Sequence, residues 1–221
     1  MKELDRRTRL WIELAIVSLW LIAPSLLSQL VVYSTHSVPV SRELQRFVST
    51  ITQVGGIAAL LLVLWSSGDS LASFGIVKEK AGRFLLVTVI LFAISFAITK
   101  TLDTKHTIAV VTAEGLQGRS ALSWSSSVFY LSIAAAMEEL LYRGYLITRL
   151  QELLKSKEWA MLISFLIFGA IHAFRGWKGF IGSAVFGFVL AITFVRTRSL
   201  SPLIAAHALH NLWLEWAVRS F

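Results

Sequence analysis

The chain has 221 residues, of which 56% are hydrophobic and only 15% charged, whereas a soluble domain carries about 25% charged residues. The formal net charge is +8, but Lys and Arg sit mainly at the ends of apolar runs. That distribution favours membrane topology signals over a nucleic-acid partner. The sequence has no Cys, which excludes disulfides and thiolate metal sites.

Long apolar runs without strand-like alternation recur along the chain, and a bilayer admits only helices or closed barrels. The sequence therefore predicts an all-α fold, a polytopic membrane helical bundle of about seven transmembrane helices. The sequence shows no internal repeat and no separate soluble domain, so residues 1–221 are expected to form a single membrane domain. The predicted spans are Leu10–Val32, Leu44–Trp65, Phe84–Thr99, Leu122–Leu150, Trp159–Phe174, Phe180–Val195 and Pro202–Val218.

The connections between these runs suggest an orientation. The first run follows Arg6, Arg7 and Arg9 and is too long for a signal-peptide core, so it is expected to remain as a span. The mixed stretch Ser66–Arg83 predicts an interfacial helix or loop. The longest polar connection is Thr101–Ala121. The placement of Lys and Arg favours a multi-pass protein of the cell membrane with a cytoplasmic N-terminus.

Charged residues interrupt the fourth predicted span. Glu138, Glu139 and Arg143 lie within Leu122–Leu150, and a charge at the bilayer centre costs at least about 2.5–3.5 kcal/mol, so such residues indicate a functional site. Glu139 precedes Arg143 by four residues, the spacing of an ion pair on one helix face. Glu138 points about 100° away and is predicted to face the bundle. The alternative is that both carboxylates are structural and pair with arginines.

The fifth predicted span carries His172. Glu138 and His172 both lie seventeen residues from Lys155, which stands in the turn between the fourth and fifth spans. In an antiparallel hairpin equal distances from the turn mean equal depth, so the two side chains are predicted to meet if both face the bundle. The alternative is a histidine that only fills the core.

The seventh predicted span begins with Ser201-Pro202, a typical helix start. His207 and Asn211 follow, four residues apart and therefore on one face, where both can donate hydrogen bonds to an oxyanion. They could instead hold helices together, because His and Asn bond across membrane helices. His210 points about 100° from Asn211 and is expected to join helices or line a cavity.

Taken in order, these motifs resemble the CPBP family, the CAAX protease and bacteriocin-processing proteins also called Abi. Tyr142 stands where that family more often has Phe. The resemblance covers residues 122–218, which are predicted to be the catalytic motif-bearing helices. It rests on Glu138-Glu139-x-x-x-Arg143 with Gly144 following, on Phe168-x-x-x-His172, and on His207-x-x-x-Asn211 behind a proline-containing helix start.

The resemblance implies an intramembrane endopeptidase, a hydrolase that cleaves a membrane-associated protein or peptide. In that scheme Glu138 and His172 activate a water molecule. His207 and Asn211 hold the oxyanion of the tetrahedral intermediate. The substrate stays open among a prenylated CAAX protein, a leader peptide and another membrane-bound chain.

The same resemblance gives Glu139 and Arg143 a supporting role in shaping the site. No cofactor is expected. A zinc-dependent protease that uses Glu138, His172 and His207 as ligands is an alternative, but the sequence lacks an H-E-x-x-H helix. A second alternative is a non-catalytic membrane protein of the same fold, with an immunity or adaptor role.

Hydrolysis inside a bilayer also requires a polar cavity that joins Glu138 to water. We expect the fourth, fifth and seventh spans to line this cavity. The basic residues place its mouth at the cytoplasmic face, near Ser66–Arg83.

Overall fold

The computed structural model describes residues 5–22, 42–102, 124–173 and 176–220. Every regular element in these residues is a helix, which confirms the predicted all-α fold. The elements are α1 (Arg6–Val17), which continues as the π-helix η1 (Ser18–Ile22), α3 (Arg42–Ser66), the 3₁₀-helix η2 (Leu71–Phe74), α4 (Ala81–Thr101), α6 (Trp124–Glu139), the π-helix η3 (Leu140–Ile147), α7 (Thr148–Leu154), α8 (Lys157–Ala170), α9 (Gly176–Thr197) and α10 (Ser201–Ser220).

Three of these helices are long and apolar enough to cross a membrane. They are Phe47–Ser66 within α3, Ala81–Thr101 (α4) and Gly176–Thr197 (α9). The predicted spans Leu44–Trp65, Phe84–Thr99 and Phe180–Val195 correspond to them within a few residues, as is usual for helix ends. The first predicted span, Leu10–Val32, extends past Ile22 into residues outside the described part of the chain. Most of Thr101–Ala121 also lies outside the described residues.

The fourth predicted span is one continuous helical rod, but its centre is not a regular α-helix. Residues Leu140–Ile147 form the π-helix η3 between α6 and α7, and all eight of its residues are buried. π-helical turns are rare and occur mostly at functional sites. The pattern of apolar residues does not distinguish a π turn from an α turn, so the sequence could not predict this segment.

Gly144 allows another part of the chain to approach η3 closely. A Cβ at this position would lie 3.0 Å from the carbonyl oxygen of Phe74 and 3.1 Å from Leu200 Cδ1. The amide of Leu200 also donates to the carbonyl of Gly75 at 2.9 Å. The stretch Ser66–Arg83, predicted as an interfacial helix or loop, therefore contains a loop around η2, between the end of α3 and the start of α4. Its buried Phe74 lies against Gly144 of the rod, and its Gly75 lies against Leu200, just before α10.

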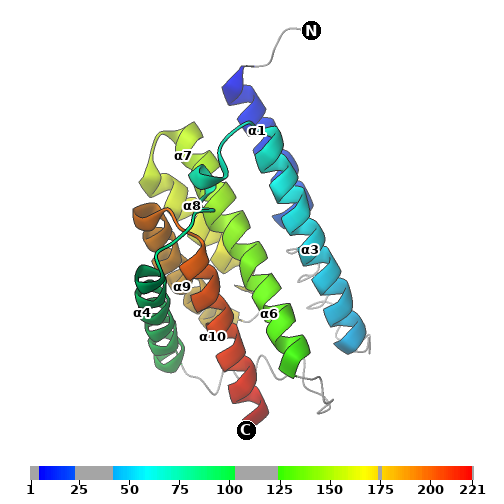
Figure 1. Cartoon of the computed structure of the whole chain (residues 1–221), viewed down its shortest axis with the longest axis vertical. Coiled ribbons are helices and arrows are strands. Elements are labelled where there is room, and N and C mark those ends of the chain that lie inside the picture. The colour runs from blue at the N-terminus through cyan, green and yellow to red at the C-terminus, as the bar shows by residue number, and fades with distance from the viewer. Residues whose placement is uncertain (1–4, 23–41, 103–123, 174–175, 221) are drawn as a thin grey trace.

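Helices α6 and α10 lie side by side and run in opposite directions (Figure 1). Helix α4 packs on the far side of α10, α3 packs against α6, and α8 pairs with α9. The first residues of α1 and helix α7 lie at one end of the bundle, at the top in Figure 1. We call the opposite end, where α10 finishes and α6 begins, the C-terminal end of the bundle.

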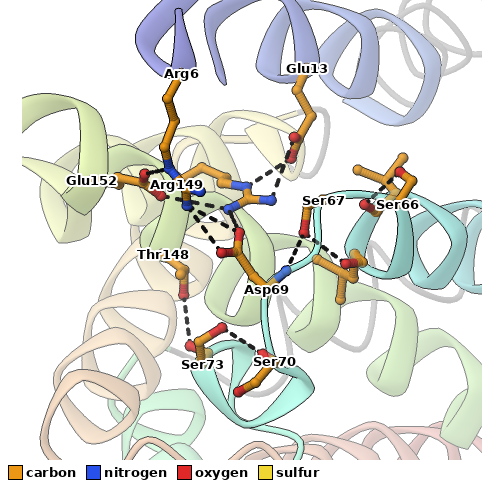
Figure 2. A network of polar contacts seen from close by, with 12 residues as sticks. Arg6, Glu13, Ser66, Ser67, Asp69, Ser70, Ser73, Thr148, Arg149 and Glu152 are labelled. Atoms are coloured by element: carbon orange, nitrogen blue, oxygen red, sulfur yellow. Dashed lines mark hydrogen bonds and ion pairs between the residues drawn. The ribbon is translucent and has the colours of Figure 1, made fainter. Parts of the chain in front are cut away.

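A polar network joins α1 to the rod at the α7 end of the bundle (Figure 2). The guanidinium of Arg149, 1% exposed, donates to Glu13 at 2.8 Å and to Asp69 at 2.7 Å. Arg6 binds Asp69 at 3.0 Å and also pairs with Glu152. Segments far apart in sequence are thus held together around the buried guanidinium of Arg149. Its carboxylate partners offset the free-energy cost of removing this charge from water.

Asp69 accepts hydrogen bonds from both arginines, and it lies outside the predicted spans. Burial of its carboxyl opposes ionisation, but the hydrogen bonds from Arg149 and Arg6 outweigh burial and hold the pKa of Asp69 below its ordinary value. A carboxyl whose pKa is lowered by folding stabilises the folded state above the unfolded pKa. That contribution is lost as the pH falls through the folded pKa.

We therefore expect Asp69→Asn to destabilise the protein at neutral pH by about 1.5–3 kcal/mol, the range for hydrogen bonds to charged groups. The difference between the variant and the natural protein should shrink as the pH is lowered below about 4. Thermal unfolding followed by tryptophan fluorescence measures both effects. Glu158→Gln, at an exposed position, is the control. A difference that stays constant down to the lowest pH would contradict the assignment.

Candidate active site

Glu139 lies at the centre of the polar group in the middle of the bundle. Its side chain and that of Arg143 are both fully buried, and Arg143 Nη1 donates to Glu139 Oε1 at 2.8 Å. Arg143 Nη2 donates to the carbonyl of Gly187 at 3.3 Å, and its guanidinium lies 4.4 Å from the centre of the Phe168 ring. The predicted ion pair between Glu139 and Arg143 is confirmed.

The same Glu139 oxygen lies 2.8 Å from Nδ1 of His207 on α10. A carboxylate oxygen only accepts, so Nδ1 carries the proton of this hydrogen bond. The sequence did not predict this contact, because it joins residues 68 positions apart. This contact means that Glu139 fixes the orientation of the His207 ring. A buried carboxylate bonded to Nδ1 orients the catalytic histidine of serine hydrolases in the same way.

The second ring nitrogen of His207 faces Glu138. His207 Nε2 lies 3.6 Å from Glu138 Oε2, and the Glu138 side chain is 29% exposed while that of His207 is 5% exposed. The adjacent glutamates thus differ as predicted, with Glu139 enclosed and paired to Arg143 and Glu138 directed elsewhere. The structure adds that Glu138 and Glu139 lie on the two sides of one imidazole.

His172 lies just after α8 and not within it. The fifth predicted span extended to Phe174, but α8 ends at Ala170. The helix thus ends four residues before the predicted span, because apolar residues continue past the last helical turn. His172 Nδ1 contacts the carbonyl oxygen of Phe168 at 2.8 Å, a carbonyl of the last turn that has no intrahelical partner.

Phe168 links His172 to the rest of the group. Its ring centre is 4.8 Å from that of His172, 6.1 Å from that of His207 and 5.3 Å from that of Tyr142. Close approach of α9 permits this packing, since a Cβ at Gly187 would lie 2.9 Å from Phe168. The three sequence motifs therefore converge on one apolar ring in the interior.

Asn211 is half-buried and stands one turn after His207 on α10. His210 is 9% exposed and packs its ring 5.2 Å from that of Phe186 and 5.9 Å from that of Trp213. His210 therefore makes aromatic contacts towards α9 and along α10. This position agrees with the expected role in holding helices together or lining a cavity.

The predicted cavity was to open near Ser66–Arg83 and to be lined by the fourth, fifth and seventh spans. A groove does lie at that end of the bundle, but it runs between α1 and α3. Its lining does not include the glutamates or histidines of the candidate site. The lining residues are Arg9, Ile12, Glu13, Ile16, Val17, Val63 and Ser66.

A zinc site was the alternative use of the same residues. Within the described part of the chain, no three His, Asp or Glu side chains are grouped so that they could hold a metal ion. Of the three ligands considered in the sequence, His207 directs Nδ1 to Glu139 and His172 directs Nδ1 to a backbone carbonyl.

Comparison with known protein families places residues 120–213 in the family of type II CAAX prenyl endopeptidases described as Rce1-like. The chain thus carries a CAAX endopeptidase family domain, and the resemblance found in its motifs is confirmed. The matched region contains α6, η3, α7, α8, α9 and all four residues predicted to be catalytic. Searches of curated proteins and of solved structures gave no match.

Proposed function

We propose that the protein is an intramembrane endopeptidase that hydrolyses a peptide bond of a membrane-associated protein. The observation that carries this proposal is the pair formed by Glu138 and His207 inside the bundle. A partly exposed carboxylate lies 3.6 Å from an imidazole whose other nitrogen is held by a buried glutamate. The family to which residues 120–213 belong supports protease chemistry.

Each residue has a separate task in this mechanism. Glu138, with His172, takes a proton from water as the oxygen attacks the scissile carbonyl. His207 and Asn211 donate hydrogen bonds to the oxyanion that forms, as preorganised donors do. When the intermediate collapses, the proton held on Glu138 passes to the leaving amine.

Glu139 and Arg143 support this arrangement from behind. Since Nδ1 of His207 donates to Glu139, Nε2 can donate to an oxyanion only if the ring carries a second proton. Glu139 lies 2.8 Å from Nδ1 and holds the ring in this orientation. Arg143 holds Glu139 in turn, by a fully buried ion pair at 2.8 Å.

The membrane arrangement that accompanies this function has seven spans with the N-terminus in the cytoplasm. Three spans have the required length and composition. The remaining four would be the rod from Trp124 to Leu154, helices α8 and α10, and the run that begins with α1. Their polar residues then face one another in the interior, where charged groups at depth are tolerated.

A substrate-trapping experiment tests the function directly. Membranes that contain the natural protein are compared with membranes that contain Glu138→Ala, and new protein N-termini are identified by mass spectrometry. The proposal predicts N-termini that depend on Glu138 and that come from membrane-associated proteins. An identical set in both membranes would instead favour the alternative, a non-catalytic immunity or adaptor protein.

Asn211→Ala should lower kcat about 10²–10³-fold, as removal of one oxyanion donor does. KM should change little, because the interaction forms in the transition state. Steady-state kinetics on a fluorogenic peptide measure both constants. His210→Ala, one position earlier, is the matched control and should have a much smaller effect. A change confined to KM would make Asn211 a substrate-binding residue.

Chelators should leave activity intact, because Glu138 activates the water in this mechanism without a metal. The measurement is peptidase activity before and after dialysis against a strong chelator, together with the zinc content of the purified protein. Near-stoichiometric zinc that is lost together with activity would favour the zinc-dependent alternative.

A further inference from the structure

Glu215 is an acidic residue in a predicted span that the proposed mechanism does not use. It lies on α10, eight residues after His207, which is about 12 Å along a helix. It is half-buried, and its Oε1 accepts a hydrogen bond from Ser127 of α6 at 3.3 Å. An ionisable group at such a position indicates a pathway or site by default.

Three polar residues repeat every four positions along α10, namely His207, Asn211 and Glu215. Positions four apart lie on nearly one face of a helix, and both ends of this stripe contact α6. His207 lies 3.6 Å from Glu138 and Glu215 lies 3.3 Å from Ser127. The stripe therefore follows the interface between α6 and α10, which we call the α6–α10 seam.

Exposure differs between the two directions that lead away from the candidate site. Towards the α7 end, all residues of η3 are buried, and Phe74, Leu200 and Leu203 are at most 3% exposed. Towards the C-terminal end of the bundle, Glu138 is 29% exposed and both Asn211 and Glu215 are half-buried. Close packing thus closes the α7 end, whereas polar and accessible groups continue towards the other.

We propose that water reaches Glu138 along the α6–α10 seam from the C-terminal end of the bundle, and that Glu215 keeps this route hydrated. The inference rests on the proposed function, because it assigns the route to the water that the peptidase consumes. A carboxylate and an amide at membrane depth hold water by hydrogen bonding. The route is opposite to the mouth near Ser66–Arg83 that the sequence suggested.

The absence of Cys from the natural sequence makes a direct test possible. Single-cysteine variants Asn211→Cys and Glu215→Cys are placed in opened membrane vesicles and treated with a charged methanethiosulfonate, which reacts with thiolates in water. The controls are Leu209→Cys and Trp216→Cys. They lie at similar depth on the outer face of α10, where the natural side chains are 45% and 53% exposed.

Both seam positions should react at least about tenfold faster than the controls. Apolar surroundings raise the pKa of a thiol, and a rise of one pKa unit lowers the thiolate fraction of the control cysteines about tenfold. Intact-mass spectrometry gives the rates without any need for peptidase activity. A failure of the proposed route is therefore distinguishable from a failure of the proposed enzyme. Equal rates on the two faces would overturn the route, and two positions are used in case one variant does not fold.

A second pair of variants tests Glu215 itself. In the Asn211→Cys background, Glu215→Leu should slow modification of the cysteine about tenfold or more, because an apolar side chain at the mouth excludes water. Glu215→Gln should leave the rate unchanged, since an amide also binds water. An unchanged rate in Glu215→Leu would remove Glu215 from the route.

Discussion

Glu138→Gln should lower the rate of cleavage about 10²–10⁴-fold, the contribution expected from a positioned general base. The substitution keeps the size of the side chain and its ability to hydrogen-bond, but an amide cannot take a proton from water. Because Glu138 is 29% exposed, the variant should keep the thermal stability of the natural protein. Peptide cleavage and thermal unfolding measured on the same preparation check both expectations.

Glu139→Gln gives the internal comparison for this prediction. Its carboxylate accepts from Arg143 and from His207 at 2.8 Å each, so the neutral amide leaves a buried guanidinium without its counter-charge. We expect a lower unfolding temperature together with reduced activity, whereas Glu138→Gln should lose activity alone. A Glu138→Gln protein with normal activity would rule out the mechanism.

The sequence predicted the ion pair between Glu139 and Arg143 but not the contact between Glu139 and His207. Charges in apolar runs are conspicuous in any membrane sequence, and spacing along one helix fixes pairs such as Glu139 with Arg143. Glu139 with His207 is a different case, because it depends on how α6 and α10 are set against each other. Helix packing of that kind is not encoded in the periodicity of either segment.

The same distinction explains the errors at helix ends and in helix type. The end of α8 at Ala170 depends on a turn in which His172 contacts the Phe168 carbonyl, and the apolar pattern continues beyond it. The π-helix η3 differs from an α-helix only in hydrogen-bond register. Hydropathy thus located the helical runs, while side-chain contacts decided where the helices end and how they wind.

Arg143→Met is the substitution with the largest expected effect on stability. The natural guanidinium is fully buried, pairs with Glu139 at 2.8 Å, donates to the Gly187 carbonyl at 3.3 Å and lies 4.4 Å from the Phe168 ring centre. Methionine fills part of this volume but leaves the Glu139 carboxylate with only His207. Removal of one partner of a buried ion pair costs about 3–5 kcal/mol, because the remaining charge stays desolvated.

Arg83→Met provides the comparison, because Glu79 and Arg83 also form an ion pair at i,i+4 spacing, at 3.5 Å, with side chains 9% and 50% exposed. Solvent around the half-exposed Arg83 screens this pair, so the variant should lose less stability than Arg143→Met. The double variant Glu139→Gln with Arg143→Met removes both charges and should recover part of the stability lost in Arg143→Met. If Arg143→Met were as stable as Arg83→Met, the buried pair would not hold the site together, and the orientation of His207 by Glu139 would need another cause.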